Sequence, residues 1–256
     1  FGFTDLTGVK FTGALTGYAC GSGGNVLKTT DGGASWSTYI TGTTMNLLSI
    51  DASGTTIIAT GVDGKIFKYN GLIWSTIDYK STAKPEVRSV AMLNPNAFYT
   101  CGGGGFINVT ADGGATRSYQ QNPMMGPLSD IYMYDGNKGW AVASTNRAIL
   151  RTNDGGATWQ FQGGVTVNRS FVRKQNTSGN IGNPFCQHPM NKHGMFILAG
   201  SNLYRSLDKG ETWVSLNSSV PGSSAHCFYV NTLDTNLMMA SKGSGGSARV
   251  IASSNY

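Results

Sequence analysis

One short motif recurs four times along this chain, and its repetition constrains the fold more than any other feature. Each copy reads Ser/Thr-x-Asp-x-Gly-x-x-Trp, except that Arg117 stands in the Trp position of the second copy. The copies cover residues 29–36, 110–117, 152–159 and 206–213. A unit repeated every few tens of residues cannot bury its apolar face alone, so neighbouring units must stack on one another.

The residues of the motif indicate a strand, a tight turn and a returning strand. The first copy lies between residues 25–29 and 36–40, two runs with strand-like composition. The Asp side chain can accept hydrogen bonds from backbone N–H groups of its own turn, and the Gly two residues later can take a positive φ. The Trp is expected to begin the returning strand and to cover the turn with its ring. We therefore predict structural roles, not catalytic ones, for Asp31, Gly33, Trp36, Asp112, Gly114, Asp154, Gly156, Trp159, Asp208, Gly210 and Trp213.

On these residues, the chain resembles the Asp-box, or BNR-repeat, β-propellers of the sialidase-like superfamily. That superfamily includes sialidases, xyloglucanases, the luminal domains of sortilin-type receptors and the photosystem II assembly-factor propellers. The sequence of the blades is most similar to the last group, in which Gly-Trp-x-x-Gly precedes Ile-Leu-x-Thr-x-Asp-Gly-Gly-x-x-Trp. In this chain, residues 139–143 resemble the first pattern and residues 149–159 resemble the second. Residues 17–21 and 26–33 resemble the same two patterns in the first blade. The resemblance implies a fold but no single function, because unrelated activities share it.

The distances between the motifs set the expected number of blades. Asp112 and Asp154 are 42 residues apart, whereas 81 residues separate Asp31 from Asp112, which is enough for two blades. A degenerate copy that lacks the Asp, residues 66–74, fills that gap. We therefore predict an all-β fold, a β-propeller of six four-stranded antiparallel blades that forms a single domain over residues 1–256. The predicted blades cover residues 7–40, 41–80, 86–121, 127–162, 184–217 and 224–256, with residues 1–6 added to the last.

The two ends of the chain are expected to complete one sheet. Residues 1–6 resemble a strand that follows a motif, and residues 249–256 resemble the strand and turn that lead into one, with Asn255 in the Asp position. Pairing of the N-terminal strand with the last three strands would close the ring and remove exposed sheet edges. The alternatives are a seven-bladed ring and a fragment of a larger propeller.

The composition favours an exported protein. Only 12% of the residues are charged, and Gly accounts for 36 of 256. The Gly clusters at 102–105 and 243–246 fall between strand patterns, so we interpret them as tight turns. No apolar run approaches the roughly 20 residues that cross a bilayer. We expect an extracellular, cell-surface or other exported compartment, no membrane span and no cofactor.

Cysteines and glycosylation-type sequences bear on the same compartment. Cys20 and Cys101 are expected in equivalent strands of separate blades, too far apart to bridge easily. Cys186 and Cys227 are the best candidate disulfide, and four buried free thiols are the alternative. None of the cysteines has metal-type spacing, so we expect no metal site. Sequons begin at Asn108, Asn168, Asn176 and Asn217, of which the last three are candidate glycosylation sites in loops.

Catalytic residues are sparse in this sequence. Only two Glu are present, Glu86 and Glu211, and the Phe/Tyr-Arg-Ile-Pro start of the sialidase pattern is missing. A xyloglucanase-like site would need two carboxylates that face each other across a cleft. Asp130 flanks a Tyr-rich strand, whereas we interpret Asp51 and Asp135 as turn residues between strands. We therefore predict that the chain is not an enzyme. The carboxylates outside the motifs are Asp5, Asp51, Asp63, Asp78, Glu86, Asp130, Asp135 and Asp234.

Two departures from the repeat indicate binding loops. They are residues 161–188 and residues 78–88. Loops inserted into a repeat often form its binding face, and the net charge of +6 favours an acidic partner. No nucleic-acid partner is expected, because base-stacking aromatics are not interleaved with the basic residues. The candidate binding residues are Arg88, Arg169, Arg173 and Lys174.

The expected function is therefore recognition. We expect a non-catalytic, exported or surface-displayed propeller that serves as an interaction scaffold for a protein or glycan partner, as one module of a larger assembly. Two alternatives stay open. One is a chaperone similar to the photosystem II assembly and stability factors, and the other is a glycoside hydrolase of the sialidase or xyloglucanase type.

Overall fold

The computed structural model divides into two compact units, residues 1–161 and residues 162–256, and each is described by itself. The predicted single domain and the number of six blades stay predictions. The structure describes residues 5–78, 84–123, 126–143, 149–161, 185–187, 195–199, 202–208, 212–219, 225–230, 238–242 and 249–253.

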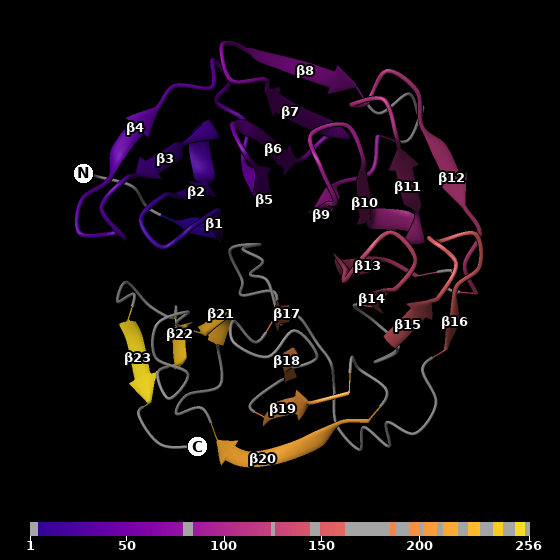
Figure 1. Ribbon diagram of the computed structural model, residues 1–256. Helices are drawn as coiled ribbons and strands as arrows, with labels where there is room; N and C mark the ends of the chain where they lie inside the picture. The colour runs from indigo at the N-terminus through magenta and orange to yellow at the C-terminus, as the bar shows by residue number, and fades with distance from the viewer. Residues whose placement is uncertain are drawn as a thin grey trace. The chain divides into compact units, whose positions relative to one another are not determined.

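The first unit consists of four antiparallel sheets of four strands each (Figure 1). Consecutive strands pair in chain order, so every sheet is a meander arranged like a propeller blade. The predicted all-β fold class is thus confirmed for this unit.

Sheet A contains β1 (Leu6–Phe11), β2 (Gly17–Gly21), β3 (Val26–Thr29) and β4 (Ser37–Tyr39). Sheet B contains β5 (Leu47–Ser53), β6 (Thr56–Gly61), β7 (Lys65–Tyr69) and β8 (Trp74–Asp78). Sheet C contains β9 (Val87–Met92), β10 (Phe98–Gly102), β11 (Ile107–Thr110) and β12 (Ser118–Gln120). Sheet D contains β13 (Leu128–Met133), β14 (Gly139–Ala143), β15 (Ile149–Thr152) and β16 (Gln160–Phe161).

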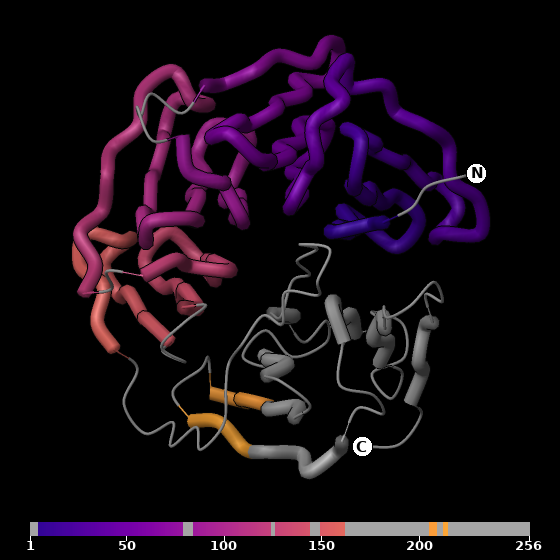
Figure 2. Tube along the Cα trace, turned by 180° about the vertical axis from the view of Figure 1, so that it is seen from behind, coloured from indigo at the N-terminus to yellow at the C-terminus, as the bar shows by residue number. Residues whose placement is uncertain are grey.

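Within this unit the first strands of the sheets are neighbours, and the fourth strands lie outside them (Figures 1 and 2). Strand β5 contacts β1 on one side and β9 on the other, and β9 contacts β13. Apolar side chains fill the space between sheets: Phe67 of sheet B packs with Tyr18 of sheet A. Leu128 of sheet D packs in the same way with Ile107 of sheet C. Burial of apolar surface between successive sheets therefore holds the unit together.

Each intact motif forms the turn between the third and fourth strands of its sheet, and we call residues 29–36, 110–117, 152–159 and 206–213 the aspartate turns. In the third of these, Asp154 Oδ1 accepts the Thr158 N–H at 2.9 Å and Oδ2 accepts the Thr158 hydroxyl at 2.6 Å. The Thr152 hydroxyl donates to Asp154 Oδ1 at 2.8 Å and accepts the Gly156 N–H at 2.8 Å. The predicted role of the Asp as an acceptor within its own turn is confirmed. The same carboxylate contacts recur around Asp31, Asp112 and Asp208.

These hydrogen bonds lower the pKa of the turn carboxyls. Donation by the Thr158 side chain and backbone, with help from Thr152, lowers the pKa of Asp154 to about 2. The bonds from Ser35 lower the pKa of Asp31 in the same way. Burial of Asp208 acts to raise its pKa, but the bonds from Thr212 and Ser206 outweigh burial and lower it. Each bond favours the ionised carboxylate, because a carboxylate accepts more strongly than a neutral acid.

The glycine and the tryptophan of the motif lie in contact, so that the indole ring covers the glycine. Gly156 has a φ of +87°, and a Cβ added there would lie 3.3 Å from Nε1 of the Trp159 indole. Gly33 and Gly114 also have positive φ, which confirms that prediction, whereas Gly210 lies outside the described residues. The predicted start of the returning strand at the Trp is wrong by one residue. Strand β16 begins after Trp159, because the Asp bonds to the residue before the Trp extend the turn.

The aspartate turns also connect hairpins and sheets. The N–H of Gly155 donates to the Asn137 carbonyl oxygen at 2.8 Å, which ties the outer hairpin of sheet D to its inner hairpin. The carbonyl oxygen of Gly155 accepts the Tyr99 hydroxyl of sheet C at 2.8 Å. In sheet C, the carbonyl oxygen of Gly113 accepts Lys68 Nζ of sheet B at 3.0 Å. The N–H of Gly113 likewise donates to the Asn96 carbonyl oxygen of its own sheet at 2.7 Å, so one glycine residue joins each of these turns to its own sheet and to the preceding one.

Arg117 behaves differently from the tryptophans that it replaces. Its guanidinium donates to the carbonyl oxygen of Asp78 in sheet B, so it reaches across to the neighbouring sheet. The glycine that an indole would cover, Gly114, is covered instead by Ile77, whose Cδ1 would lie 2.4 Å from an added Cβ. The loss of the indole is therefore compensated from the preceding sheet.

The degenerate copy keeps the turn with different chemistry. Asn70 Oδ1 accepts the N–H groups of Leu72 at 2.9 Å and Ile73 at 3.0 Å, and Gly71 has a φ of +99°. Strand β8 begins at Trp74, as the pattern predicted. An asparagine turn thus replaces the aspartate turn in sheet B.

A β-bulge near the start of the first strand recurs in sheets A to D, and the motif analysis did not predict it. The pairing shifts between Leu47 and Ser49 of β5 and between Leu128 and Asp130 of β13. The opposite strand ends on a glycine in sheet C, where a Cβ added to Gly102 would lie 2.0 Å from the Glu86 carbonyl oxygen. The absence of a side chain there lets the two backbones approach, and the bulge re-aims the side chains that follow.

Sheets E and F form the second unit. Sheet E contains β17 (Phe185–Gln187), β18 (Met195–Ala199), β19 (Asn202–Ser206) and β20 (Val214–Ser219). Sheet F contains β21 (Ala225–Val230), β22 (Met238–Lys242) and β23 (Arg249–Ser253). The predicted closure by the N-terminal strand involves residues 1–4 and Asn255, which lie outside the described residues. The assignment of Leu6 to that strand is wrong, because Leu6 begins β1 and pairs with Gly21 of its own sheet.

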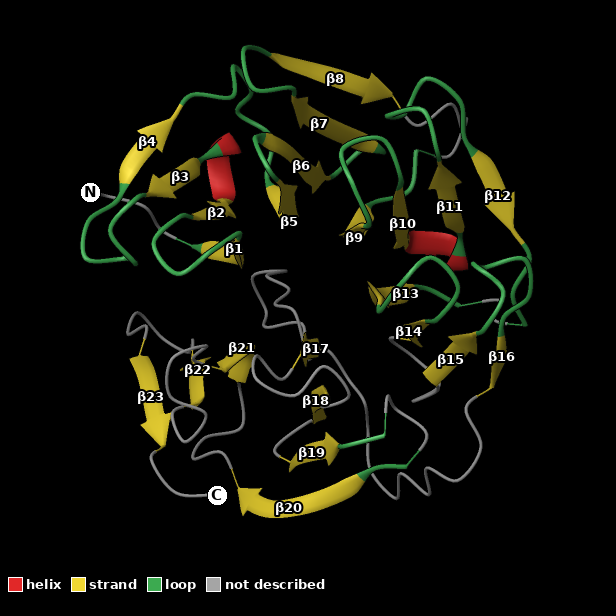
Figure 3. Cartoon of the chain, viewed as in Figure 1, coloured by secondary structure: helices red, strands yellow, loops and turns green. Residues whose placement is uncertain are grey.

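Helical structure is slight in the described part of the chain. It consists of two three-residue 3₁₀ turns, η1 (Ser22–Gly24) and η2 (Gly103–Gly105), each between the second and third strands of its sheet (Figure 3). The interpretation of residues 102–105 as a tight turn is confirmed, and residues 243–246 lie outside the described residues. None of the helices described has the length and hydropathy that a bilayer crossing requires.

Removal of the buried hydroxyl of an aspartate turn should destabilise the protein. We expect Thr152→Val to cost about 1–3 kcal/mol in the free energy of unfolding, because the Gly156 N–H loses its acceptor and Asp154 loses a donor. Thr152→Ser keeps the hydroxyl and is the matched control. Urea unfolding of the three proteins measures the difference, and equal losses in the two variants would contradict the role given to the hydroxyl.

The lowered carboxyl pKa predicts acid sensitivity. The pKa of Asp154 is about 2 in the folded protein and about 3.9 in an unfolded chain, so its stabilising contribution is full above pH 4 and is lost as the pH falls toward 2. The unfolding temperature of Asp154→Asn should therefore fall less steeply than that of the wild type between pH 4 and pH 2. Thermal unfolding across this range tests the prediction, and parallel curves would refute it.

Candidate functional site: charged residues of the first strands

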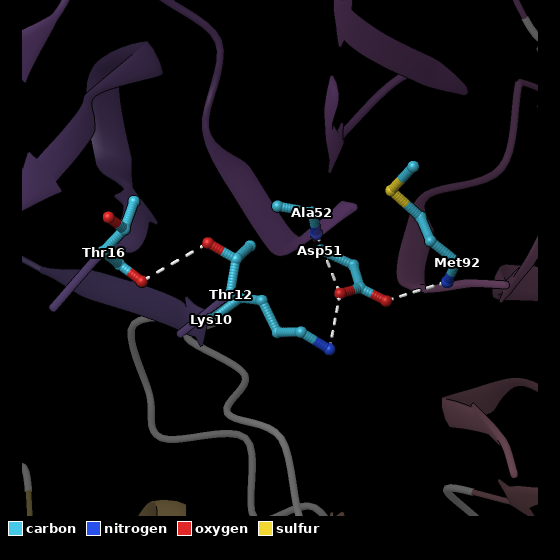
Figure 4. Close-up of polar contacts among 6 residues, drawn as sticks. All are labelled: Lys10, Thr12, Thr16, Asp51, Ala52 and Met92. Carbon is cyan, nitrogen blue, oxygen red and sulfur yellow. Dashed lines mark hydrogen bonds and ion pairs between the residues drawn. The ribbon is translucent and has the colours of Figure 1, made fainter. Parts of the chain in front are cut away.

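Asp51 is a carboxylate of the first strands that bonds to residues of two other sheets (Figure 4). It lies within β5, and its side chain is 10% exposed. Its Oδ1 accepts Lys10 Nζ of sheet A at 2.8 Å and the Ala52 N–H at 2.8 Å, and its Oδ2 accepts the Met92 N–H of sheet C at 2.8 Å. One carboxylate therefore connects three consecutive sheets. Such a group is already satisfied as an acceptor, which suits a clamp better than a proton donor.

The interpretation of Asp51 as a turn residue is wrong. Strand β5 continues to Ser53, and Asp51 lies within it, opposite Ile58 of β6. The interpretation of Asp135 is confirmed, because its Oδ1 accepts the N–H groups of Asn137 at 2.8 Å and Lys138 at 2.7 Å in the β13–β14 turn. The difference is where each strand ends, because β13 ends at Met133, before Asp135, whereas β5 ends at Ser53, after Asp51.

Asp130 is a second buried carboxylate between sheets. It is 2% exposed, and its Oδ1 accepts the Ser89 hydroxyl of sheet C and the Ile131 N–H at 3.0 Å. Ser89 also accepts the Ile131 N–H, at 3.3 Å. Asp130 is one of the carboxylates outside the motifs that a hydrolase could use. Its burial and its bond across the junction of sheets C and D give it a structural role that accounts for its position.

Arg88 is the one predicted binding residue that the structure describes. It lies at the bulge of β9, and its Nε contacts Glu86 Oε2 at 3.1 Å. Its side chain is 17% exposed, against 41% for the Glu86 side chain. Part of its charge is therefore balanced locally, and an acidic partner would compete with Glu86 for it.

Most of the other predicted sites lie outside the described residues. This holds for Arg169, Arg173, Lys174, Asn168 and Asn176. Asn217 lies in β20, and the proposed disulfide partners lie in β17 and β21, but the side chains there are not described. The disulfide Cys186–Cys227 and the use of Asn217 as a glycosylation site stay predictions.

Cys20 and Cys101 are buried cysteines without a disulfide bond, in equivalent strands, β2 and β10. Burial raises the pKa of Cys20 to about 12, although the Thr7 hydroxyl acts in the opposite direction. Such a thiol is neutral at physiological pH and behaves as a small apolar side chain. Asn108 of the first sequon is 7% exposed within β11, a position that a glycosylating enzyme does not reach. No group of three or more His, Cys, Asp or Glu that could hold a metal ion occurs among the described residues.

No family model matches the chain, and no curated protein matches its sequence. Solved structures match it well in fold. The chain has a β-propeller fold. YCF48 bound to D1 peptide has a TM-score of 0.66 and 17% identity, over 98% of this chain and 77% of that one. Virginiamycin B lyase from Staphylococcus aureus has a TM-score of 0.68 and 13% identity, over 97% and 84%. The GH74 xyloglucanase from Xanthomonas campestris has a TM-score of 0.64 and 14% identity, over 97% and 44%. At these identities the likeness concerns the fold alone, and it spans enzymes and non-enzymes.

The clamp around Asp51 should contribute to stability. We expect Asp51→Ala to cost about 1–3 kcal/mol in the free energy of unfolding, because the Met92 N–H loses its acceptor in a largely buried place. Lys10→Met should cost less than about 1 kcal/mol, because the Lys10 side chain is 43% exposed and its ion pair is screened. Urea unfolding measures both, and a larger loss for Lys10→Met than for Asp51→Ala would refute this assignment.

Proposed function

We propose that this propeller is a non-catalytic interaction scaffold, exported or displayed at a surface, that binds a protein or glycan partner as one module of a larger assembly. The observation that carries the proposal is the engagement of Asp51 and Asp130, the two buried carboxylates of the first strands, in bonds between sheets. A hydrolytic pair needs one carboxyl that can give a proton and one that can receive it at the substrate. Rigid sheets with variable loops suit recognition instead.

The match to YCF48 supports a protein partner within this proposal. That protein was solved with a D1 peptide, and its fold covers 98% of this chain. A role similar to the photosystem II assembly factors is therefore the second candidate. Binding of a fluorescent D1 peptide by this chain, measured by anisotropy, would favour that candidate over a general scaffold.

The scaffold function predicts that a partner binds through the segment 161–188, which carries Arg169, Arg173 and Lys174 and which we call the basic loop. A tagged chain cross-linked in the cells that produce it should yield a partner that also binds as a purified protein. Arg173→Ala combined with Lys174→Ala should weaken that binding, because charge complementarity holds an acidic partner. The matched control is Lys138→Ala, in the β13–β14 turn. Unchanged binding by the double variant would remove the basic loop from the proposal.

The non-catalytic assignment predicts no glycosidase turnover. The chain should release no product from a fluorogenic sialoside or from xyloglucan oligosaccharides. Turnover that disappears in Asp130→Asn, with the unfolding temperature unchanged, would overturn the assignment.

Protease digestion of intact cells tests the exported location, and a chain fully protected until the cells are lysed would contradict it.

A further inference from the structure

The junction between sheets A and B carries a cluster of aromatic side chains near the β7–β8 turn. Tyr39 of β4 lies with its ring centroid 5.0 Å from that of Tyr69 in β7 and 6.4 Å from that of Trp74 in β8. Tyr18 of β2 lies 6.5 Å from Tyr39. Tyr18 is buried, whereas the other three rings are partly exposed, so the cluster reaches the surface.

Lys28 holds its ammonium over two of these rings. Its Nζ lies 5.9 Å from the Tyr18 centroid and 5.5 Å from the Tyr39 centroid. Lys68, at the equivalent position of sheet B, donates instead to the Gly113 carbonyl oxygen of the next aspartate turn. For Lys28 of sheet A, the corresponding turn of the next sheet is the degenerate one of sheet B, where the Gly71 carbonyl oxygen accepts the Tyr69 hydroxyl at 2.9 Å. Within the described part of the chain, the Lys28 ammonium therefore has aromatic rings but no carboxylate as partners.

The same degenerate turn exposes two large aliphatic side chains. Leu72 is 84% exposed and Ile73 is 64% exposed. Their N–H groups bond to Asn70, which fixes the turn. In the two positions before the Trp position, the four motifs have alanine or glutamate followed by serine or threonine. Exposed apolar side chains grouped beside partly exposed rings are typical of an interaction site.

We propose that this junction docks a short segment of a partner protein that carries apolar side chains and a carboxylate. The apolar side chains would cover Leu72 and Ile73, and the carboxylate would pair with Lys28. The acidic character follows from the energetics of burial, because covering an ammonium with apolar groups alone removes its water without compensation. The inference rests on the proposed scaffold function and names its site and the chemistry of its partner.

Labelled peptides test the site directly. The probes are fluorescein-labelled repeats of Asp-Leu-Leu-Ser, of Lys-Leu-Leu-Ser and of Asp-Ser-Ser-Ser, titrated with the full chain by fluorescence anisotropy. The first should bind more tightly than either of the others. Leu72→Ser combined with Ile73→Thr should weaken its binding about tenfold, the loss expected on removing an anchoring contact. Lys28→Gln should bring the acidic and basic peptides to nearly equal affinity.

The control variant is Leu15→Ser, which removes an aliphatic side chain of the β1–β2 loop that is 60% exposed, close to the 64% of Ile73. It should bind the acidic peptide like the wild type, and all variants should keep the wild-type unfolding temperature. Equal binding of the three peptides, or an equal effect of Leu15→Ser, would overturn the site. Concentration-dependent self-association that the Leu72/Ile73 variant abolishes would overturn it in favour of a second copy of this chain.

The result also separates this inference from the function on which it rests. A cellular partner that the Leu72/Ile73 variant captures as well as the wild type would refute the docking site and leave the scaffold function intact. Peptide binding at the junction, in a chain that captures no partner from its own cells, would support the site and count against the scaffold function.

Discussion

One carboxylate holds the outer hairpin of each sheet that keeps the intact motif, and the rest of the first unit depends on it. In sheet D, Asp154 accepts the backbone and hydroxyl of Thr158, while the Thr152 hydroxyl and Gly156 complete the turn. The turn then bonds through Gly155 to the inner hairpin. Four strands become one sheet by local bonds, and the sheets are then joined by apolar packing together with polar bonds such as those of Asp51 and Asp130.

The turns could be predicted from the sequence because their chemistry is local. The acceptor role of Asp154 and the positive φ of Gly156 both follow from residues within one motif. Asp51 could not be placed in this way, because the motifs do not show that β5 extends to Ser53, and because its Lys10 partner belongs to another sheet. The start of β16 was missed by one residue, since the Asp bond to Thr158 lengthens the turn.

The candidate sites also divide into those predicted from local sequence and those that depend on contacts between sheets. Departures from the repeat predicted the basic residues, of which Arg88 lies in β9 and pairs with Glu86. The junction around Lys28 could not be recognised from one motif, because its meaning comes from a comparison between sheets. Lys68 shows what a lysine at that position does when the turn of the neighbouring sheet, here sheet C, is intact. Where the neighbouring turn is degenerate, as beside Lys28, the lysine ammonium and the exposed aliphatic side chains of that turn form the proposed docking site.

The bond from one sheet to the glycine carbonyl of the next turn limits how such a chain can evolve. An ammonium makes this bond between sheets B and C, and a phenol makes it between sheets C and D. A duplicated or transplanted repeat would arrive beside a neighbour with a donor of different length, even if its own turn were perfect. Selection therefore acts on pairs of adjacent repeats, and a gain or loss of one repeat would require compensating changes on both of its flanks.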